Sequence, residues 1–246
     1  MIADLRTMMW KEWNELLLQQ GGVRSGLLPM LILPLGIMGV FLPWQMGRAW
    51  VESPLTPALW AWLPLMLTAS LVADSFAGER ERHTLETLLA SRLPDRAILF
   101  GKMCAVVGYG WGLTLLSVLI GLVTVNLIYG RGELLLYSPP LTATIIALSL
   151  LGAWLSASAG VLVSLRAATV RQAQQVLMIT IMLLLFGPVY GLQALPDAWR
   201  ARLAGWLTAG GPAKPVIVVM ALLTVIDLTL TVLAAARFQR ARLTLS

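Results

Sequence analysis

Side chains that could take part in catalysis are scarce in this sequence. The only histidine is His83 and the only cysteine is Cys104, so a serine–histidine triad in the membrane, a His-Glu-x-x-His metal site and a cysteine-based zinc cage all lack their residues. A phosphate-binding loop is also missing, because Gly101 and Lys102 are followed by methionine and lack the upstream glycine. Asp74 and Asp227 lack the flanking residues expected of an aspartate-based intramembrane protease. We therefore expect no catalytic residue, no metal site and no bound cofactor in this chain.

The charged segment 77–101 carries most of the remaining polar chemistry. Glu79 and His83, like Arg82 and Glu86, are opposite-type pairs four residues apart, and such pairs support a helix. The same helix would carry an apolar edge formed by Leu85, Leu88 and Leu89. A short charged helix with a leucine edge offers a partner protein a surface to bury. Alternatively, the charged segment is simply solvated and serves only to orient the chain in the membrane.

Pro94 should end this helix, and Asp95 could then cap the helix that follows.

One carboxylate lies deep in an apolar run. Asp227 is near the middle of residues 216–236, and an acid at that depth requires a partner or a cavity. It could face a translocation path or a partner subunit, or it could be bonded to hydroxyls in a helix interface. The predicted spans also contain four helix-breaking residues, Pro29, Pro34, Gly187 and Pro188. Such residues fit a helix that lines a variable cavity, but they also occur in helices that merely pack.

The elements that position these residues are membrane helices. Of the 246 residues 58% are apolar and only 12% are charged, which excludes an ordinary soluble fold. The apolar residues form unbroken runs and do not alternate as barrel strands do. An all-α, polytopic chain is therefore predicted, with six spans at 27–44, 59–76, 103–128, 141–165, 176–195 and 216–236.

The basic residues orient these spans. Thirteen of the eighteen Lys and Arg lie in the N-terminus, the tail and the loops after the second and fourth spans, so both termini are predicted to be cytoplasmic. Tryptophans gather at the outer ends of spans, at positions 44, 50, 60, 62, 199 and 206, as expected at headgroup level. The net charge of +6 is spread over loops, which favours contact with anionic lipid over nucleic acid.

Two further patterns concern packing. Residues 1–20 place Ile2, Leu5, Met9, Trp13 and Leu16 at helical spacing, which predicts an amphipathic helix anchored at the inner interface, or a moving gate element. No cleavable signal peptide is expected, because about 25 rather polar residues precede the first apolar run. In the fourth span, small residues recur every fourth position and predict close helix packing: Gly152, Ser156, Gly160 and Ser164.

The charged segment resembles a known family. The run Ala77-Gly-Glu-Arg-Glu-Arg-His-Thr-Leu-Glu-Thr-Leu-Leu, with Leu93-Pro94, Ile98-Leu99 and Gly101-Lys102 after it, is similar to the signature loop of ABC-2 type permeases, the membrane subunits of a class of ATP-binding-cassette exporters. Weaker similarities lie at 164–173 and at Leu195-Pro196. Two positions depart from the family pattern: His83 replaces a typical glycine, and Gly210-Gly-Pro212-Ala-Lys-Pro215 replaces an Asn-Pro.

The resemblance implies a fold and a function. The fold would be the type II ABC exporter (ABC-2) transmembrane fold in one permease domain, with a cytoplasmic coupling loop at 77–101 and an outer loop at 196–215. The residues implied to contact the ATPase are Glu79, Arg80, Glu81, Arg82, His83, Thr84, Leu85, Glu86, Leu88, Leu89, Arg166, Arg171 and Gln172.

Partners also follow from the resemblance. Two ATPase subunits would carry ATP and Mg²⁺, a second copy or a sister permease would complete the pathway, and the complex would export its substrate from the bacterial inner membrane. A proton-coupled secondary transporter and a non-transporting partner-binding membrane protein are the alternatives. Charge reversal at Glu79 or Glu86 is expected to uncouple ATP hydrolysis from transport and to leave the fold intact.

Overall fold

The computed structural model describes residues 2–18, 27–82, 93–211 and 213–238, and within these ranges the chain forms helices joined by short connections. In chain order the elements are α1 (Ile2–Leu18), α2 (Leu27–Gly36), the π-helical turn η1 (Ile37–Phe41), α3 (Leu42–Met46), α4 (Ala49–Glu52), α5 (Thr56–Ala73), the π-helical turn η2 (Asp74–Gly78), α6 (Glu79–Glu81), α8 (Asp95–Tyr129), α9 (Pro139–Ser164), α10 (Val170–Ala194), α11 (Asp197–Thr208) and α12 (Ala213–Arg237).

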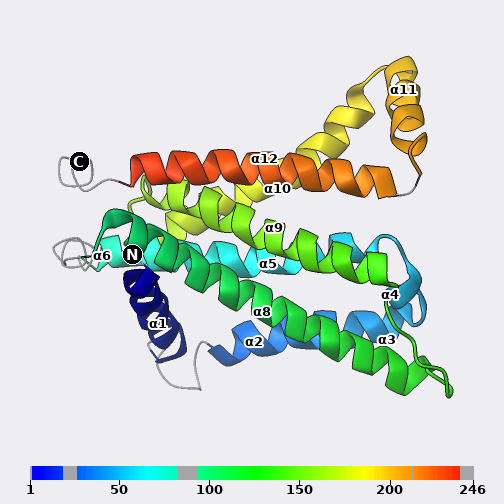
Figure 1. Ribbon diagram of the computed structural model, residues 1–246, viewed down its shortest axis with the longest axis horizontal. Helices are drawn as coiled ribbons and strands as arrows, with labels where there is room; N and C mark the ends of the chain where they lie inside the picture. Colours follow the sequence, from blue (N-terminus) through cyan, green and yellow to red (C-terminus); the bar gives the residue numbers. More distant parts are fainter. Residues whose placement is uncertain (1, 19–26, 83–92, 212, 239–246) are drawn as a thin grey trace.

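The long helices run beside one another along the long axis of the molecule (Figure 1). The start of α1, α6 and the end of α12 lie at one end of this bundle, which we call the α6 end. Helices α4 and α11 lie at the opposite end, the α11 end. Charged side chains of segments far apart in the sequence therefore meet at the α6 end.

Five helical stretches are long and apolar enough to cross a membrane. They are Thr56–Glu81, Asp95–Tyr129, Pro139–Ser164, Val170–Ala194 and Ala213–Arg237, and each contains most of one predicted span. The first predicted span, 27–44, coincides with α2, η1 and α3, of which Ile32–Met46 forms a shorter apolar helix. Pro34 lies inside α2, three residues before the π turn begins. The helix is thus irregular where the sequence predicts a break.

The start of α8 differs in detail from its prediction. Pro94 occupies the N-cap position and Asp95 is the first helical residue, so the expectation that Asp95 is the cap was wrong. Its carboxylate still lies in the first turn, where the helix dipole favours negative charge.

Small residues bring α9 against α5, as predicted. The Ser156 hydroxyl donates to the Leu65 carbonyl at 2.8 Å, and a Cβ placed on Gly152 would lie 3.1 Å from the Ala61 carbonyl oxygen. Membrane helices associate through such close backbone approach because the lipid is as apolar as the side chains.

Two apolar clusters fill the ends of the bundle. Met8, Phe76 and Phe238 belong to the cluster at the α6 end, where the two phenylalanine rings meet edge to face. At the α11 end, Trp50 and Trp60 pack edge to face with centroids 5.4 Å apart. Both indoles are fully buried, so at this end of the bundle they fill the protein's own core.

Among the described residues, those of α10, α11 and α12 are the least covered. No residue of α11 is buried, and the outer part of α10 leaves the bundle on its way to α11 (Figure 1). Pro188 lies inside α10, and a Cβ on Gly187 would meet open space. After α11 the chain turns at Gly211, whose φ of +81° favours glycine.

Close packing of α9 can be tested at Gly160. A Cβ there would overlap Val72 Cγ1 and lie 3.3 Å from Leu177 Cδ2, so Gly160→Ala should destabilise the protein by about 1–3 kcal/mol. Gly191→Ala is the matched control, because its Cβ would meet open space. Thermal unfolding in detergent measures both variants. Equal melting temperatures would contradict the packing described for α9.

Candidate functional site

The candidate functional site is a group of charged side chains at the α6 end, contributed by α1, η2, α6 and α8. Its centre is Lys102, in the third turn of α8, whose side chain is only 1% exposed. A buried ammonium group is costly unless it is paired and hydrogen-bonded. The groups around Lys102 therefore define what the site can do.

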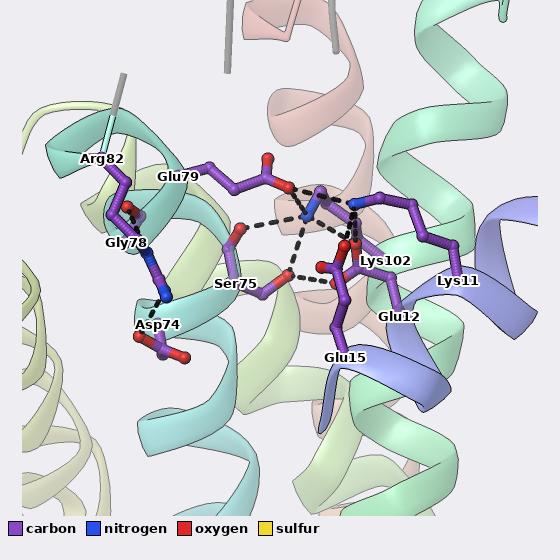
Figure 2. A network of polar contacts seen from close by, with 9 residues as sticks. All are labelled: Lys11, Glu12, Glu15, Asp74, Ser75, Gly78, Glu79, Arg82 and Lys102. Carbon is purple, nitrogen blue, oxygen red and sulfur yellow. Dashed lines mark hydrogen bonds and ion pairs between the residues drawn. The ribbon is translucent and has the colours of Figure 1, made fainter. Parts of the chain in front are cut away.

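Two glutamates and a serine surround Lys102 (Figure 2). Its Nζ lies 2.8 Å from Glu12 Oε1 of α1 and 2.8 Å from Glu79 Oε1 of α6. It also donates to the Ser75 carbonyl at 3.1 Å and to the Ser75 hydroxyl at 3.2 Å. The Ser75 hydroxyl in turn donates to Glu12 Oε2 at 2.9 Å. One ammonium thus connects three segments of the chain.

A second lysine lies at the edge of this network. Lys11 Nζ is 2.8 Å from Glu15 Oε1 and 3.5 Å from Glu79 Oε1. Partial burial alone would lower the pKa of Lys11, but the carboxylates of Glu15, Glu12 and Glu79 together raise it above its ordinary value. Because the folded-state pKa is raised, this stabilisation is present at neutral pH and is lost only as the solution becomes strongly alkaline.

Helix α1 docks on α8 through a face that only partly matches the predicted apolar face. Met8 is fully buried and Glu12 nearly so, whereas Trp13, on the predicted apolar face, remains about half exposed. Glu12 can turn inward because Lys102 neutralises it. Gly101 allows the close approach, since a Cβ there would lie 2.7 Å from Met8 Cβ. The Trp13 indole also donates to the Ala105 carbonyl at 3.2 Å.

The carboxylates in this site could in principle hold a cation. Oxygens of Glu12, Glu15 and Glu79 lie within 4.8 Å of one another, a donor set that suits a hard divalent ion. Two ammonium groups already lie among these oxygens, and Lys102 is in direct contact with two of the three carboxylates. The arrangement fits an internal ion-pair cluster better than a metal site.

The start of the charged loop folds back on itself. Arg82 pairs with Asp74 at 3.0 Å and donates to the Gly78 carbonyl at 3.1 Å. A Cβ on Gly78 would lie 2.6 Å from the Arg82 guanidinium, so the Arg82 side chain packs closely over this glycine. The predicted pairing of Arg82 with Glu86, and of Glu79 with His83, involves residues outside the described ranges.

Arg80 and Glu81 of α6 form hydrogen bonds to the loop between α9 and α10. Arg80 donates to the Leu165 carbonyl at 2.9 Å, and Glu81 accepts a hydrogen bond from the Val170 amide at 3.0 Å. The Glu81 carboxylate therefore lies at the N-terminus of α10, where negative charge is favoured.

Alanines pack beneath these contacts. Ala77 of η2 lies in a small buried cluster with Ala73, Ala167 and Ala173. Residues 79–82 and 165–172, which are predicted to touch an ATPase separately, thus form one continuous surface. We call it the joined surface.

The predicted site residues are distributed as follows. Glu79, Arg80, Glu81 and Arg82 lie in or beside α6, and Arg166, Arg171 and Gln172 lie at the junction of α9 and α10. Residues His83, Thr84, Leu85, Glu86, Leu88 and Leu89 lie outside the described residues. Asp227 lies elsewhere, in α12, where its side chain is buried and neither carboxylate oxygen has a hydrogen-bond partner in the described part of the chain.

Sequence reasoning missed Glu12, Ser75 and Lys102 as members of one site. It treated Lys102 as one more basic residue at the inner side, although its place between apolar residues of a helix and after Gly101 was a usable signal. The expectation for Glu79 also needs correction. Reversing its charge would place two ammonium groups together in a buried site, so that variant would not leave the fold intact.

Comparison with known families agrees with the fold. The family profile described as ABC-2 family transporter protein matches residues 51–208, which is more than half of the chain. The match runs from α4 through α11 and includes the joined surface, whereas α1 and α12 lie outside it. No curated protein matches the chain at a significant level.

Replacing Lys102 tests the ion-pair cluster. Lys102→Met would leave Glu12 and Glu79 buried without their ammonium group, and should lower the free energy of unfolding by about 3–5 kcal/mol. Lys11→Met is the matched control: its side chain is 39% exposed, so a loss of about 1 kcal/mol or less is expected. Chemical or thermal unfolding in detergent gives both values.

The charge-free triple variant Lys102→Met/Glu12→Gln/Glu79→Gln completes this test. It should recover most of the lost stability, because no buried charge is then left unpaired. A triple variant as unstable as Lys102→Met would show that packing, and not charge, explains the loss.

Proposed function

We propose, because the chain belongs to the ABC-2 transporter family, that it is the permease subunit of an ABC transporter and is driven by a separate ATPase subunit. The observation that carries the coupling is the joined surface, in which Arg80 and Glu81 bond residues 79–82 to residues 165–170. A partner that pushes on either segment moves both, because charged hydrogen bonds connect them.

The α6 end is the cytoplasmic end in this proposal. It holds the start of α1, α6, the start of α8, the junction of α9 and α10 and the end of α12, and most of the basic residues in the described part of the chain belong to these segments. The chain then crosses the bacterial inner membrane six times, with α2, η1 and α3 as the first span. Both termini are cytoplasmic.

Lys102 connects the segment that would contact the ATPase to the membrane helices, so a movement of that segment would reach them. Glu79 follows directly on α5 and η2, and through Lys102 it is bonded to α8 and α1. When ATP and Mg²⁺ bind the two ATPase subunits and these close, the region around Glu79–Leu89 passes the movement to spans 1, 2 and 5. A second copy or a sister permease completes the translocation path, and export follows from the family.

Asp227 is a second feature that the proposal uses. Its carboxylate is buried on α12, and one turn further on Thr231 accepts a hydrogen bond from Trp154 of α9 at 2.9 Å. A carboxylate without a partner at this depth is costly. We assign it to the translocation path or to the contact with the second permease.

Co-purification is the first test of the proposal. The chain, purified from its own cells in mild detergent, should bring an ATPase subunit with it at one ATPase per permease, and substrate should stimulate ATP hydrolysis. A complex that lacks an ATPase and whose transport follows a proton gradient would establish the secondary transporter instead. A complex with neither activity would favour the partner-binding protein.

Loosening the joined surface is a sharper test. The exposed hydrogen bond from the Val170 amide to Glu81 contributes about 1 kcal/mol or less, so Glu81→Ala should weaken ATPase binding by up to about fivefold and lower the substrate transported per ATP. Arg48→Ala is the control, because it removes an exposed ion pair with Glu133 at the α11 end. Loss of binding in the control, or none in Glu81→Ala, would contradict coupling through this surface.

The third test concerns Asp227. Asp227→Asn keeps the shape of the side chain and removes its charge, so transport should fall about tenfold while the amount of assembled complex changes little. Transport assays and size-exclusion profiles of the same preparation measure both. Normal transport by this variant would remove Asp227 from the pathway.

A further inference from the structure

A cavity of about 330 Å³ opens at the α6 end, where α9 and α12 end and α10 begins. It shares no residue with the Lys102 cluster, whereas Arg166, Ala167 and Gln172 also belong to the joined surface. The residues that line it are Leu162, Val163, Arg166, Ala167, Gln172, Val176, Leu233 and Arg237. A cavity of this size suits a small polar group with part of an apolar chain.

Two arginines give this cavity its charge. Arg166 follows α9 and Arg237 ends α12, and in the described part of the chain neither guanidinium has an ion-pair partner. Glu81, on the neighbouring joined surface, already accepts a hydrogen bond from the Val170 amide. Two guanidinium groups beside one cavity match a phosphate, because their planar forks donate to its oxygens.

Apart from Gln172, the rest of the lining is apolar, and this apolar surface continues along the helices. Leu162, Val163, Val176 and Leu233 form the apolar part. Beyond them the outward side chains of α10 and α12 are apolar and largely exposed, among them Ile179, Leu183, Val225, Leu228 and Val232. A group that binds here meets positive charge at the end of the bundle and a hydrocarbon-like surface further in.

We propose that this cavity binds the phosphate of an anionic phospholipid, with the acyl chains lying along α10 and α12. A free phosphate would satisfy the arginines but would leave the apolar lining uncovered. An acidic segment of the ATPase would likewise match only the charge. The phospholipid satisfies both parts of the lining, and the proposal does not depend on coupling to an ATPase.

Lipid titration tests this assignment. The full-length chain in neutral detergent would be titrated with short-chain phosphatidylglycerol, and its melting temperature followed. A saturable rise is expected, and both Arg166→Gln and Arg237→Gln should raise the half-saturating concentration about fivefold, since one arginine near anionic lipid contributes about that factor. Phosphatidylcholine, whose choline group carries a positive charge, should stabilise the chain much less.

Arg171→Gln is the matched control. Arg171 carries the same charge on the first turn of α10 but does not line the cavity, so this variant should respond to phosphatidylglycerol like the unaltered chain. An unchanged response in Arg237→Gln, or equal stabilisation by phosphatidylcholine, would overturn the proposal. The same rise with inorganic phosphate would assign the cavity to free phosphate. If phosphatidylglycerol has no effect and Arg237→Gln weakens ATPase binding, the cavity serves the ATPase.

Discussion

The arrangement at the α6 end depends on one buried ammonium group. Lys102 lies within 2.8 Å of carboxylates on α1 and α6, and the charge is tolerable only while both carboxylates are present. Glu12 and Lys102 are 90 residues apart in the chain. The position of the N-terminal helix, the start of the charged loop and the third turn of α8 are therefore set together, since displacing any one of them leaves buried charge unpaired.

Each of the three residues of α6 contacts a different neighbouring element. Successive helical residues point about 100° apart, so Glu79, Arg80 and Glu81 reach Lys102, the Leu165 carbonyl and the Val170 amide in turn. One helical turn thus joins α1 and α8 on one side to α9 and α10 on the other. This geometry explains why alternating charges occur in the segment: each sign meets the opposite charge or dipole in a different part of the fold.

The sequence predicts some of this structure and not the rest. Apolar runs indicate the long helices, and the spacing of Gly152 and Ser156 indicates close packing, because both signals are local. The ion-pair cluster is not local: Glu12 reads as a polar position on a surface helix, and Lys102 as an orienting charge. Trp50 and Trp60 need tertiary information for a related reason: a tryptophan near the end of a span can contact headgroups or fill a core, and here the two rings pack against each other in the core.

The two groups of basic residues at the α6 end differ in what neutralises them. Lys102 finds its counter-charges within the chain, so its role is to hold elements in position. Arg166 and Arg237 lie beside helices whose outward faces remain apolar and exposed. Within the described residues no carboxylate forms an ion pair with either arginine. In the lipid proposal, the phosphate of the bound phospholipid supplies their counter-charge. The buried pair network and the open cavity therefore represent two uses of positive charge, one that fixes the fold and one that binds.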